Sequence, residues 1–225
     1  MHAKSGLRVL LEWKIYCPDS VITAVICLTL TSPWHWIQTM FLDPSKFGIV
    51  RCLEANWQTI RDEYLALPKE AFDPWVQRSM HGAGWSVFGL VAGGHQIPGG
   101  QKRCPRTSEI LSLLDGIGLA GFSRMAPGTH ISAHSGWAEN EYRLHLGLVV
   151  PDGCSLRVAN ETRVWREGKC LVFDDTIEHE AWNNSTEIRA NLMVDFLRPG
   201  KTEFSIPISQ DVREYAEGLF GNDNP

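Results

Sequence analysis

Residues 167–199 read EGKCLVFDDTIEHEAWNNSTEIRANLMVDFLRP. This stretch predicts two β-strands, Lys169 to Asp174 and Ile188 to Leu197, joined by a polar turn. His179 lies in the turn, and Arg189 lies on the second strand. A histidine just past a strand end, followed by an arginine on the next strand, suits a metal at the mouth of a β-barrel. The arginine would then reach the carboxylate of an acidic ligand.

Short segments rich in β-branched and aromatic residues precede this stretch, with turn residues between them. They are residues 84–91, 119–125, 142–150, 154–159 and 163–167. Regularly spaced short strands predict an antiparallel double-sheet barrel of the jelly-roll or cupin type, a mainly β fold with flanking helices. We expect one such domain over residues 41–200, after an extension of uncertain role over residues 1–40 and before a C-terminal tail over residues 201–225.

The expected flanking helices follow from apolar spacing and turn residues. Ile49, Leu53, Trp57, Ile60 and Tyr64 recur at intervals of three and four, which predicts one helical stripe ended by Pro68. Residues 93–100 are rich in glycine and read as a loop. Residues 106–114 predict a short helix capped by Thr107 or Ser108, and residues 211–219 predict another in the tail.

Charge and cysteine usage restrict the class of protein. The 225-residue chain carries a net charge of −5, and it has no run of basic residues. A nucleic-acid surface is therefore not expected, since phosphate binding needs clustered Lys and Arg. Its six cysteines are scattered without a CxxC pair. In a chain of this length that pattern indicates reduced thiols and favours a cytoplasmic protein.

An apolar run near the N-terminus raises the question of a membrane. Val21 to Leu30 is too short to span a bilayer by itself, and its extension to Phe41 takes in Pro33 and His35. We therefore favour a soluble amphipathic or buried segment. Membrane association through residues 21–41 is the alternative.

The segment YRLHLGLVV, residues 142–150, has the clearest alternation in the chain. Arg143 and His145 share one face of the predicted strand with Gly147, and three leucines share the other. A buried arginine needs an anionic partner. A ligand carboxylate, a structural ion pair and a solvated outer face are all open at this point.

The strand at 188–197 repeats this logic. Arg189, Asn191, Met193 and Asp195 fall on one face, and apolar residues fall on the other. Facing into a barrel, two arginines on separate strands would match the two ends of a dicarboxylate, because arginine binds carboxylates through two parallel hydrogen bonds.

A second metal ligand is expected upstream of His179. The sequence MAPGTHISAHSGW contains His130 and His134, and His134 lies at a Ser/Gly turn. Iron(II) oxygenases use two histidines and one carboxylate, with the short motif His-x-Asp/Glu. Here the motif reads His134-Ser135-Gly136, and glycine cannot ligate. Spacing alone thus leaves the triad incomplete, and the aspartates near His179 suit turn capping equally well.

Three segments together resemble the aspartyl/asparaginyl β-hydroxylase domain family. They are GTHISAHSGW, the run from YRLHLGLVV to EHEAWNNS, and RANLMVDFLRP. The resemblance extends from about Phe41 to Pro199 and implies an oxygenase on a double-stranded β-helix that depends on iron(II), 2-oxoglutarate and O2. The animal members have glycine two positions after the first histidine, so Gly136 fits the family pattern.

The resemblance also implies roles for particular residues. His134 and His179 are expected to hold the iron, and Ser123 and Arg189 are expected to bind the distal carboxylate of 2-oxoglutarate. Arg143 and His145 match positions near its other end.

The substrate is less determined by the resemblance. We expect hydroxylation of the β-carbon of an aspartyl or asparaginyl residue or a related amino acid. The alternatives are a lipid acyl-chain hydroxylase and a non-catalytic ligand-binding jelly roll. Trp85 and Trp137 are the expected substrate contacts, with a core position as the alternative for Trp85.

Overall fold

The computed structural model of the chain describes residues 11–17, 20–26, 39–206 and 210–221. Two units are separable, Met1–Gln38 and Thr39–Pro225. In the first unit, β1 (Leu11–Cys17) pairs with β2 (Ser20–Ile26) in antiparallel register. The apolar run expected at residues 21–30 thus begins on a strand, and residues 27–38 lie outside the described part. The helices of the described part are all too short or too polar to span a lipid bilayer.

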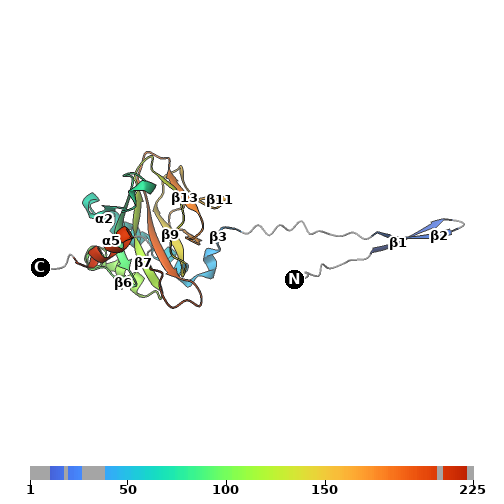
Figure 1. The fold of residues 1–225 in the computed structure, drawn as a ribbon, viewed down its shortest axis with the longest axis horizontal. Helices are drawn as coiled ribbons and strands as arrows, with labels where there is room; N and C mark the ends of the chain where they lie inside the picture. The colour runs from blue at the N-terminus through green and yellow to red at the C-terminus, as the bar shows by residue number, and fades with distance from the viewer. Residues whose placement is uncertain (1–10, 18–19, 27–38, 207–209, 222–225) are drawn as a thin grey trace. The chain divides into compact units, whose positions relative to one another are not determined.

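Two antiparallel sheets form the framework of the second unit (Figure 1). The larger sheet runs β3 (Phe41–Leu42), β12 (Cys170–Phe173), β9 (Glu141–Val149), β14 (Arg189–Leu197), β7 (Ile117–Met125), β5 (Trp85–Ala92) and β4 (Asp73–Pro74), with β6 (His95–Gln96) also paired to β5. The smaller sheet runs β11 (Glu161–Val164), β10 (Cys154–Val158), β13 (His179–Asn183) and β8 (His130–His134). The predicted double-stranded β-helix is confirmed.

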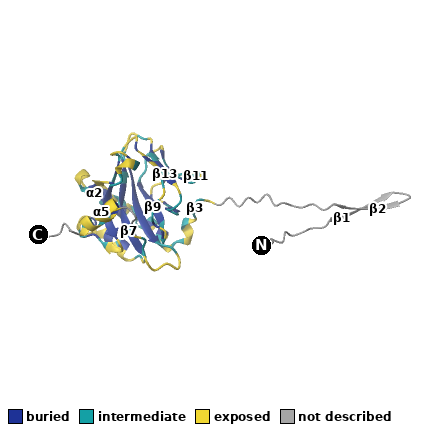
Figure 2. Ribbon diagram, in the orientation of Figure 1, coloured by how far each residue is buried: buried dark blue, intermediate teal, exposed yellow. Residues whose placement is uncertain are grey.

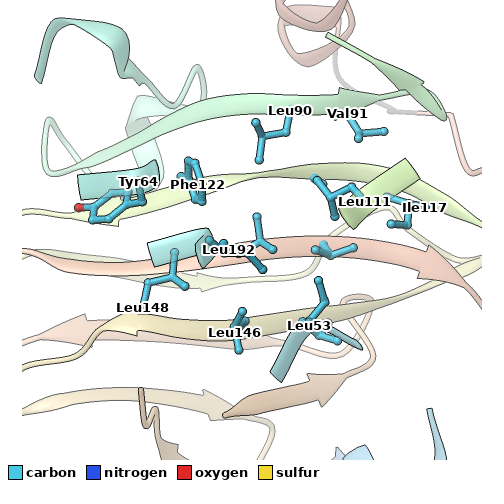
Figure 3. Packing of buried hydrophobic residues seen from close by; sticks show 14 of the residues in the cluster. Leu53, Tyr64, Leu90, Val91, Leu111, Ile117, Phe122, Leu146, Leu148 and Leu192 are labelled. Carbon is cyan, nitrogen blue, oxygen red and sulfur yellow. The ribbon is translucent and has the colours of Figure 1, made fainter. Parts of the chain in front are cut away.

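Most of the helices cover the outer face of the larger sheet, whereas the C-terminal helix packs on the apolar cluster between the sheets. The α-helices are α1 (Gly48–Ala55), α2 (Trp57–Ala66), α3 (Pro98–Arg103), α4 (Pro105–Ser112) and α5 (Gln210–Gly221), and three short 3₁₀ turns are Pro44–Lys46, Lys69–Ala71 and Arg78–Met80. Figure 3 shows Leu53 of α1, Tyr64 of α2 and Leu111 of α4 beside leucines of the sheet. Each fully buried leucine contributes about 1.5–3 kcal/mol.

The alternation in β9 sorts its side chains as predicted. Leu144, Leu146 and Leu148 are fully buried under the helices, whereas Arg143 and His145 are buried between the two sheets. Figure 2 shows the central strands β7 and β9 as the most buried part of the unit. A second apolar cluster, with Trp85, Trp165 and Phe173 among its members, fills the space between the sheets. That space holds the polar residues singled out in the sequence.

Two helix predictions were wrong in detail. The single stripe over residues 49–64 is two helices separated at Asn56, whose amide nitrogen donates to the carbonyl of Cys52 at 2.9 Å. The expected caps Thr107 and Ser108 lie inside α4, because Pro105 starts the helix. The carboxylate of Glu63, on α2, instead accepts from the freed backbone N–H groups at 3.0 and 2.7 Å. The predicted glycine-rich loop likewise contains β6 and the start of α3.

The polar turn predicted between residues 174 and 188 was also wrong. It contains β13, which pairs with β10 on one side and β8 on the other. His179, Ala181 and Asn183 are buried on one face of this strand, and Trp182 alternates with them. The five residues of β13 are too few for a clear period of two, and Glu178 and Glu180 beside His179 make the segment resemble a polar loop. His179 is therefore the first residue of a strand.

Candidate metal centre

His134 and His179 lie side by side on adjacent strands of the smaller sheet. They are register partners at the end of β8 and the start of β13, and their ring centroids are 4.2 Å apart. Neighbouring antiparallel strands bring paired side chains to one face. Residues 45 positions apart thus form one site (179 minus 134).

Backbone carbonyls determine the tautomer of both rings. Nδ1 of His134 lies 2.7 Å from the carbonyl oxygen of Ser132, and Nδ1 of His179 lies 2.8 Å from that of Ile177. A carbonyl oxygen only accepts, so each Nδ1 carries a proton and each Nε2 keeps its lone pair. Burial lowers the pKa of both rings, that of His179 to about 3. Neutral rings with free Nε2 atoms are metal donors.

Asp175 supplies a carboxylate beside these rings. It is fully buried, and its Oδ1 accepts from Arg143 and lies 3.4 Å from Nε2 of His179. Its Oδ2 has no hydrogen-bond partner in the structure. A Cβ added to Gly136 would lie 1.5 Å from this Oδ2. Asp175 therefore occupies the space that a side chain at position 136 would need.

The donor set fits a cation. His179 Nε2 and the Asp175 carboxylate are both acceptors at close range, and a buried carboxylate oxygen without a partner is costly unless something positive completes it. Among the described residues, no group of three or more His, Cys, Asp or Glu side chains is arranged to hold a metal by itself. The candidate donors are thus the Nε2 atoms of two histidines, with one carboxylate adjacent to them.

Arg143 lies in a network of ion pairs. It donates to both carboxylate oxygens of Asp195, at 2.8 and 2.7 Å, and to Asp175. This is the structural ion pair left open by the sequence. The guanidinium holds Asp175 in place and brings no unneutralised charge to a ligand.

Arg189 has a different environment. It is buried, none of the ion pairs of the described residues includes it, and its Nε has no partner. Its guanidinium lies 4.3 Å from the ring of Trp165 and donates to the sulfur of Met125. With its amide oriented to satisfy both polar atoms, Asn191 accepts from Arg189 Nη1 at 2.8 Å. Burial lowers the pKa of Arg189 to about 10, and the side chain remains a buried cation in need of an anion.

Aromatic rings connect the arginine to the histidine pair. His145 lies 6.0 Å from Trp165 and 5.3 Å from Phe173, and Phe173 lies 5.2 Å from His179. Burial, followed by the charge of Arg189, lowers the pKa of His145 well below its usual value. A neutral His145 thus lies between the metal-donor end and the cationic end of one site.

Ser123 lies on β7, next to the strand of Arg189. It is buried, and its hydroxyl accepts from Nε1 of Trp85 at 3.0 Å. The Ser123 oxygen accepts in this bond, so the proton of the hydroxyl remains available to donate to a ligand.

A small cavity of about 60 Å³ opens beside His134. Both predicted substrate contacts, Trp85 and Trp137, line it, together with Trp75 and Met193. The ring of Trp75 stacks on Trp85 with centroids 5.0 Å apart. Trp85 is therefore both a core aromatic and a wall of the cavity next to the metal donors.

Comparison with known families bears directly on this geometry. The sequence profile described as "Aspartyl/Asparaginyl beta-hydroxylase" matches residues 54–199. The chain belongs to this family. The resemblance of the three sequence segments is thereby confirmed.

Relatives within the family carry more than one substrate name. The human protein named aspartyl/asparaginyl beta-hydroxylase is 39% identical over 163 residues, 68% of this chain and 22% of the human protein. A Rhizobium tropici protein named ornithine lipid ester-linked acyl 2-hydroxylase is 42% identical over 121 residues, 52% of this chain and 43% of that protein. A Burkholderia pseudomallei structure titled as a 2OG-Fe(II) oxygenase family oxidoreductase is 18% identical, with a TM-score of 0.45 over 66% of this chain and 81% of its own. The chain spans less than half the length of both curated relatives.

Proposed function

We propose that this protein is an iron(II)- and 2-oxoglutarate-dependent hydroxylase. The observation that carries the proposal is the pairing of two neutral histidines and a partnerless carboxylate oxygen with a separate buried arginine that lacks a counter-ion. A metal would satisfy the two histidine Nε2 atoms, with the Asp175 carboxylate beside it, and the distal carboxylate of 2-oxoglutarate would give Arg189 its counter-ion. The membership of the hydroxylase family supports both assignments.

Each residue has a defined task in this proposal. His134 and His179 hold the iron through Nε2, and Asp175, held by Arg143, orients a water or proton beside it. Arg189 and the Ser123 hydroxyl bind the distal carboxylate, and iron with its co-substrates supplies the oxidation of an unactivated C–H bond. In the balanced reaction one oxygen atom of O2 enters the C–H bond and the other enters succinate, as 2-oxoglutarate loses CO2.

Two substrate classes follow from the names of the relatives. The name of the human relative gives the β-carbon of an aspartyl or asparaginyl residue, and the name of the rhizobial relative gives an acyl chain. The two neutral histidines with free Nε2 atoms disfavour a non-catalytic ligand-binding jelly roll, which would need Arg189 to bind an anion but would not need a pair of metal donors. The free thiols of Cys52, Cys104, Cys154 and Cys170 support a reducing, cytoplasmic location.

Anaerobic iron(II) titration and 2-oxoglutarate turnover test the proposal. The full chain should bind one iron(II) and convert 2-oxoglutarate to succinate even without substrate. His179→Ala should abolish iron binding, and Arg189→Ala should raise the 2-oxoglutarate requirement while iron still binds. His95→Ala is the matched control, since His95 is exposed and lies on β6 in the larger sheet. Full iron binding without His179 would overturn the assignment.

A further inference from the structure

The cavity beside His134 adjoins a second cavity that no assigned role explains. Trp75 and Met193 line both of them. The second cavity, of about 50 Å³, extends over the inner face of β5 and β7 and is roofed by α5. A third, larger cavity of about 280 Å³ adjoins the second one, with Leu119 and Ala216 lining both. Three neighbouring cavities thus follow one another away from His134, and we call this row of cavities the path.

The C-terminal segment forms the roof of this path. Val212 of α5 is buried, and Tyr215 lies edge-on to Trp75 with centroids 6.2 Å apart. Glycines of the sheet admit the roof, because a Cβ at Gly89 would lie 3.2 Å from Leu219 and one at Gly118 would lie 2.7 Å from Phe204. Figure 1 shows α5, in red, against the sheet at the end of the chain. The tail is thus a wall of the cavities.

The chemistry of the second cavity is uniform. Its lining is apolar apart from the hydroxyl of Tyr215: Trp75, Val87, Phe88, Gly89, Val91, Ala92, Ile97, Leu119, Ala120, Gly121, Met193, Val212, Tyr215, Ala216 and Leu219. That hydroxyl is buried and has no hydrogen-bond partner in the structure. A polar ligand would have to leave its hydration shell for walls that offer almost no hydrogen bonds.

The charge around the metal donors points the same way. Arg143 is the one cation lining the cavity beside His134, and Asp175 and Asp195 already neutralise it. Arg189 is taken up by the co-substrate in the proposed function. A substrate carboxylate at the reacting carbon would therefore meet buried carboxylates without a free counter-ion.

We propose that the path under α5 binds an uncharged apolar chain of the substrate, of the alkyl or acyl type, and that α5 sets how much chain fits. The proposal rests on the hydroxylase function proposed above and selects between its two substrate classes. The reacting C–H bond lies at the end of the path next to His134 and His179. Ala216 of α5 lines the second and third cavities. Because its side chain is small, the chain of the substrate can pass it, and a larger side chain there would limit the chain length.

Substitution at Ala216 tests the role of α5. Ala216→Phe should fill the path, and phenylalanine is tolerated within a helix. Gly218→Phe is the matched control, because position 218 is exposed and nothing lies within 4 Å of an added Cβ. Each variant is compared with the wild-type full chain over a series of N-acyl glycines of increasing length.

Two readouts are needed. Quenching of tryptophan fluorescence reports binding of N-decanoylglycine without any turnover, since Trp75, Trp85 and Trp137 line the first cavity. Mass spectrometry of the iron- and 2-oxoglutarate-loaded protein reports hydroxylation of the acyl glycines, of phosphatidylcholine vesicles and of an aspartyl peptide amide. The vesicle arm separates a membrane lipid from a soluble acyl compound as the source of the chain.

The expected result is hydroxylation of an acyl probe at least about tenfold faster than of the aspartyl peptide, a difference of 1.4 kcal/mol. Ala216→Phe should shift both binding and turnover to shorter chains, and Gly218→Phe should leave the length profile unchanged. Hydroxylation of the aspartyl peptide alone, no acyl probe bound or hydroxylated, or an unchanged profile in Ala216→Phe overturns the apolar-chain proposal. If the wild type binds neither iron(II) nor 2-oxoglutarate, the proposed hydroxylase function fails, and this outcome is distinct from failure of the apolar-chain proposal.

Discussion

The carboxylate of Asp175 occupies the space in which a side chain at position 136 would lie. An added Cβ at Gly136 would be 1.5 Å from Oδ2 of Asp175, and the backbone N–H of Gly136 donates to the carbonyl of Asp175 at 2.8 Å. A side chain at position 136 and the Asp175 carboxylate in its present place therefore exclude each other. Arg143 donates to Asp175 and holds its carboxylate in place. The carboxylate beside the two histidines thus comes from residue 175 and not from the third position of the His-x-Asp/Glu motif.

Restoring the familiar triad at position 136 should therefore damage the site. In Gly136→Asp the new side chain collides with Asp175 and pushes it from Arg143, and breaking such a buried pair costs about 3–5 kcal/mol. We expect a lower Tm in differential scanning fluorimetry and weaker iron(II) binding in anaerobic titration. The double variant Gly136→Asp with Asp175→Gly should recover part of both. A single variant with unchanged Tm and iron affinity would contradict this account of the space.

The sequence was sufficient to predict the faces of the long strands. Strict alternation in residues 142–150 and 188–197 placed Arg143, His145 and Arg189 between the sheets, because a period of two in a half-buried strand has only one solution. The pairing of His134 with His179 came instead from the family resemblance, since spacing alone left the triad incomplete.

Contacts between distant segments were beyond sequence reasoning. The occupation of the Gly136 space by Asp175 depends on how two loops meet, and the bidentate bond of Arg143 to Asp195 depends on the pairing of β9 with β14. The roof formed by α5 was missed because a short amphipathic helix in a tail carries no signal for the surface that it covers.

Arg157 should influence iron binding without touching the metal donors. It lies on β10 and donates to Glu180 at 2.5 Å and Glu178 at 3.1 Å, the two neighbours of His179. It also donates to the carbonyl of Ala159, whose N–H in turn donates to the carbonyl of Glu178 at 2.8 Å. These bonds hold the start of β13 in register.

We therefore expect Arg157→Ala to weaken iron(II) binding about tenfold, in the range of residues that orient metal ligands. The Tm should change little, since the pairs are partly exposed. Arg157→Lys should recover part of the affinity. Arg163→Ala is the control, because Arg163 pairs with Glu161 in the same sheet, away from His179. Equal iron affinities in Arg157→Ala and Arg163→Ala would disprove this positioning role.

His81 should make the fold less stable in mild acid. It is buried beside two tryptophans that line the cavity next to His134: its Nε2 lies 3.1 Å from the carbonyl of Trp75, and its Nδ1 accepts from the backbone N–H of Trp85 at 3.3 Å. Burial lowers the pKa of this ring. Below about pH 6.5 the ring is protonated in the unfolded chain but resists protonation in the folded protein. The stabilising contribution of His81 is therefore present above about pH 6.5 and is lost as the pH falls through the lowered pKa of the folded state.

Urea unfolding at about pH 7.5 and about pH 5.5 measures this effect. His81→Asn keeps an acceptor for the Trp85 N–H and removes the titrating group. The variant should lose less free energy of unfolding between the two pH values than the wild type, by at most about 1.4 kcal/mol per pH unit for one proton. His95→Asn, at an exposed position on β6, should behave like the wild type. Parallel curves for wild type and His81→Asn would show that this ring does not titrate differently on folding.

Arg189 should reduce the stability of the ligand-free fold. Its charge is buried with no carboxylate partner among the described residues, and burial lowers its pKa to about 10. Arg189→Met replaces it with an apolar chain of similar length against Met125 and Trp165, which should raise the free energy of unfolding of the ligand-free protein by on the order of 1–3 kcal/mol. The wild type alone should gain Tm on addition of 2-oxoglutarate, because ligand binding stabilises only the form that binds it. Reversed signs, with a less stable variant that 2-oxoglutarate still stabilises fully, would mean that Arg189 serves the core and that the distal carboxylate binds elsewhere.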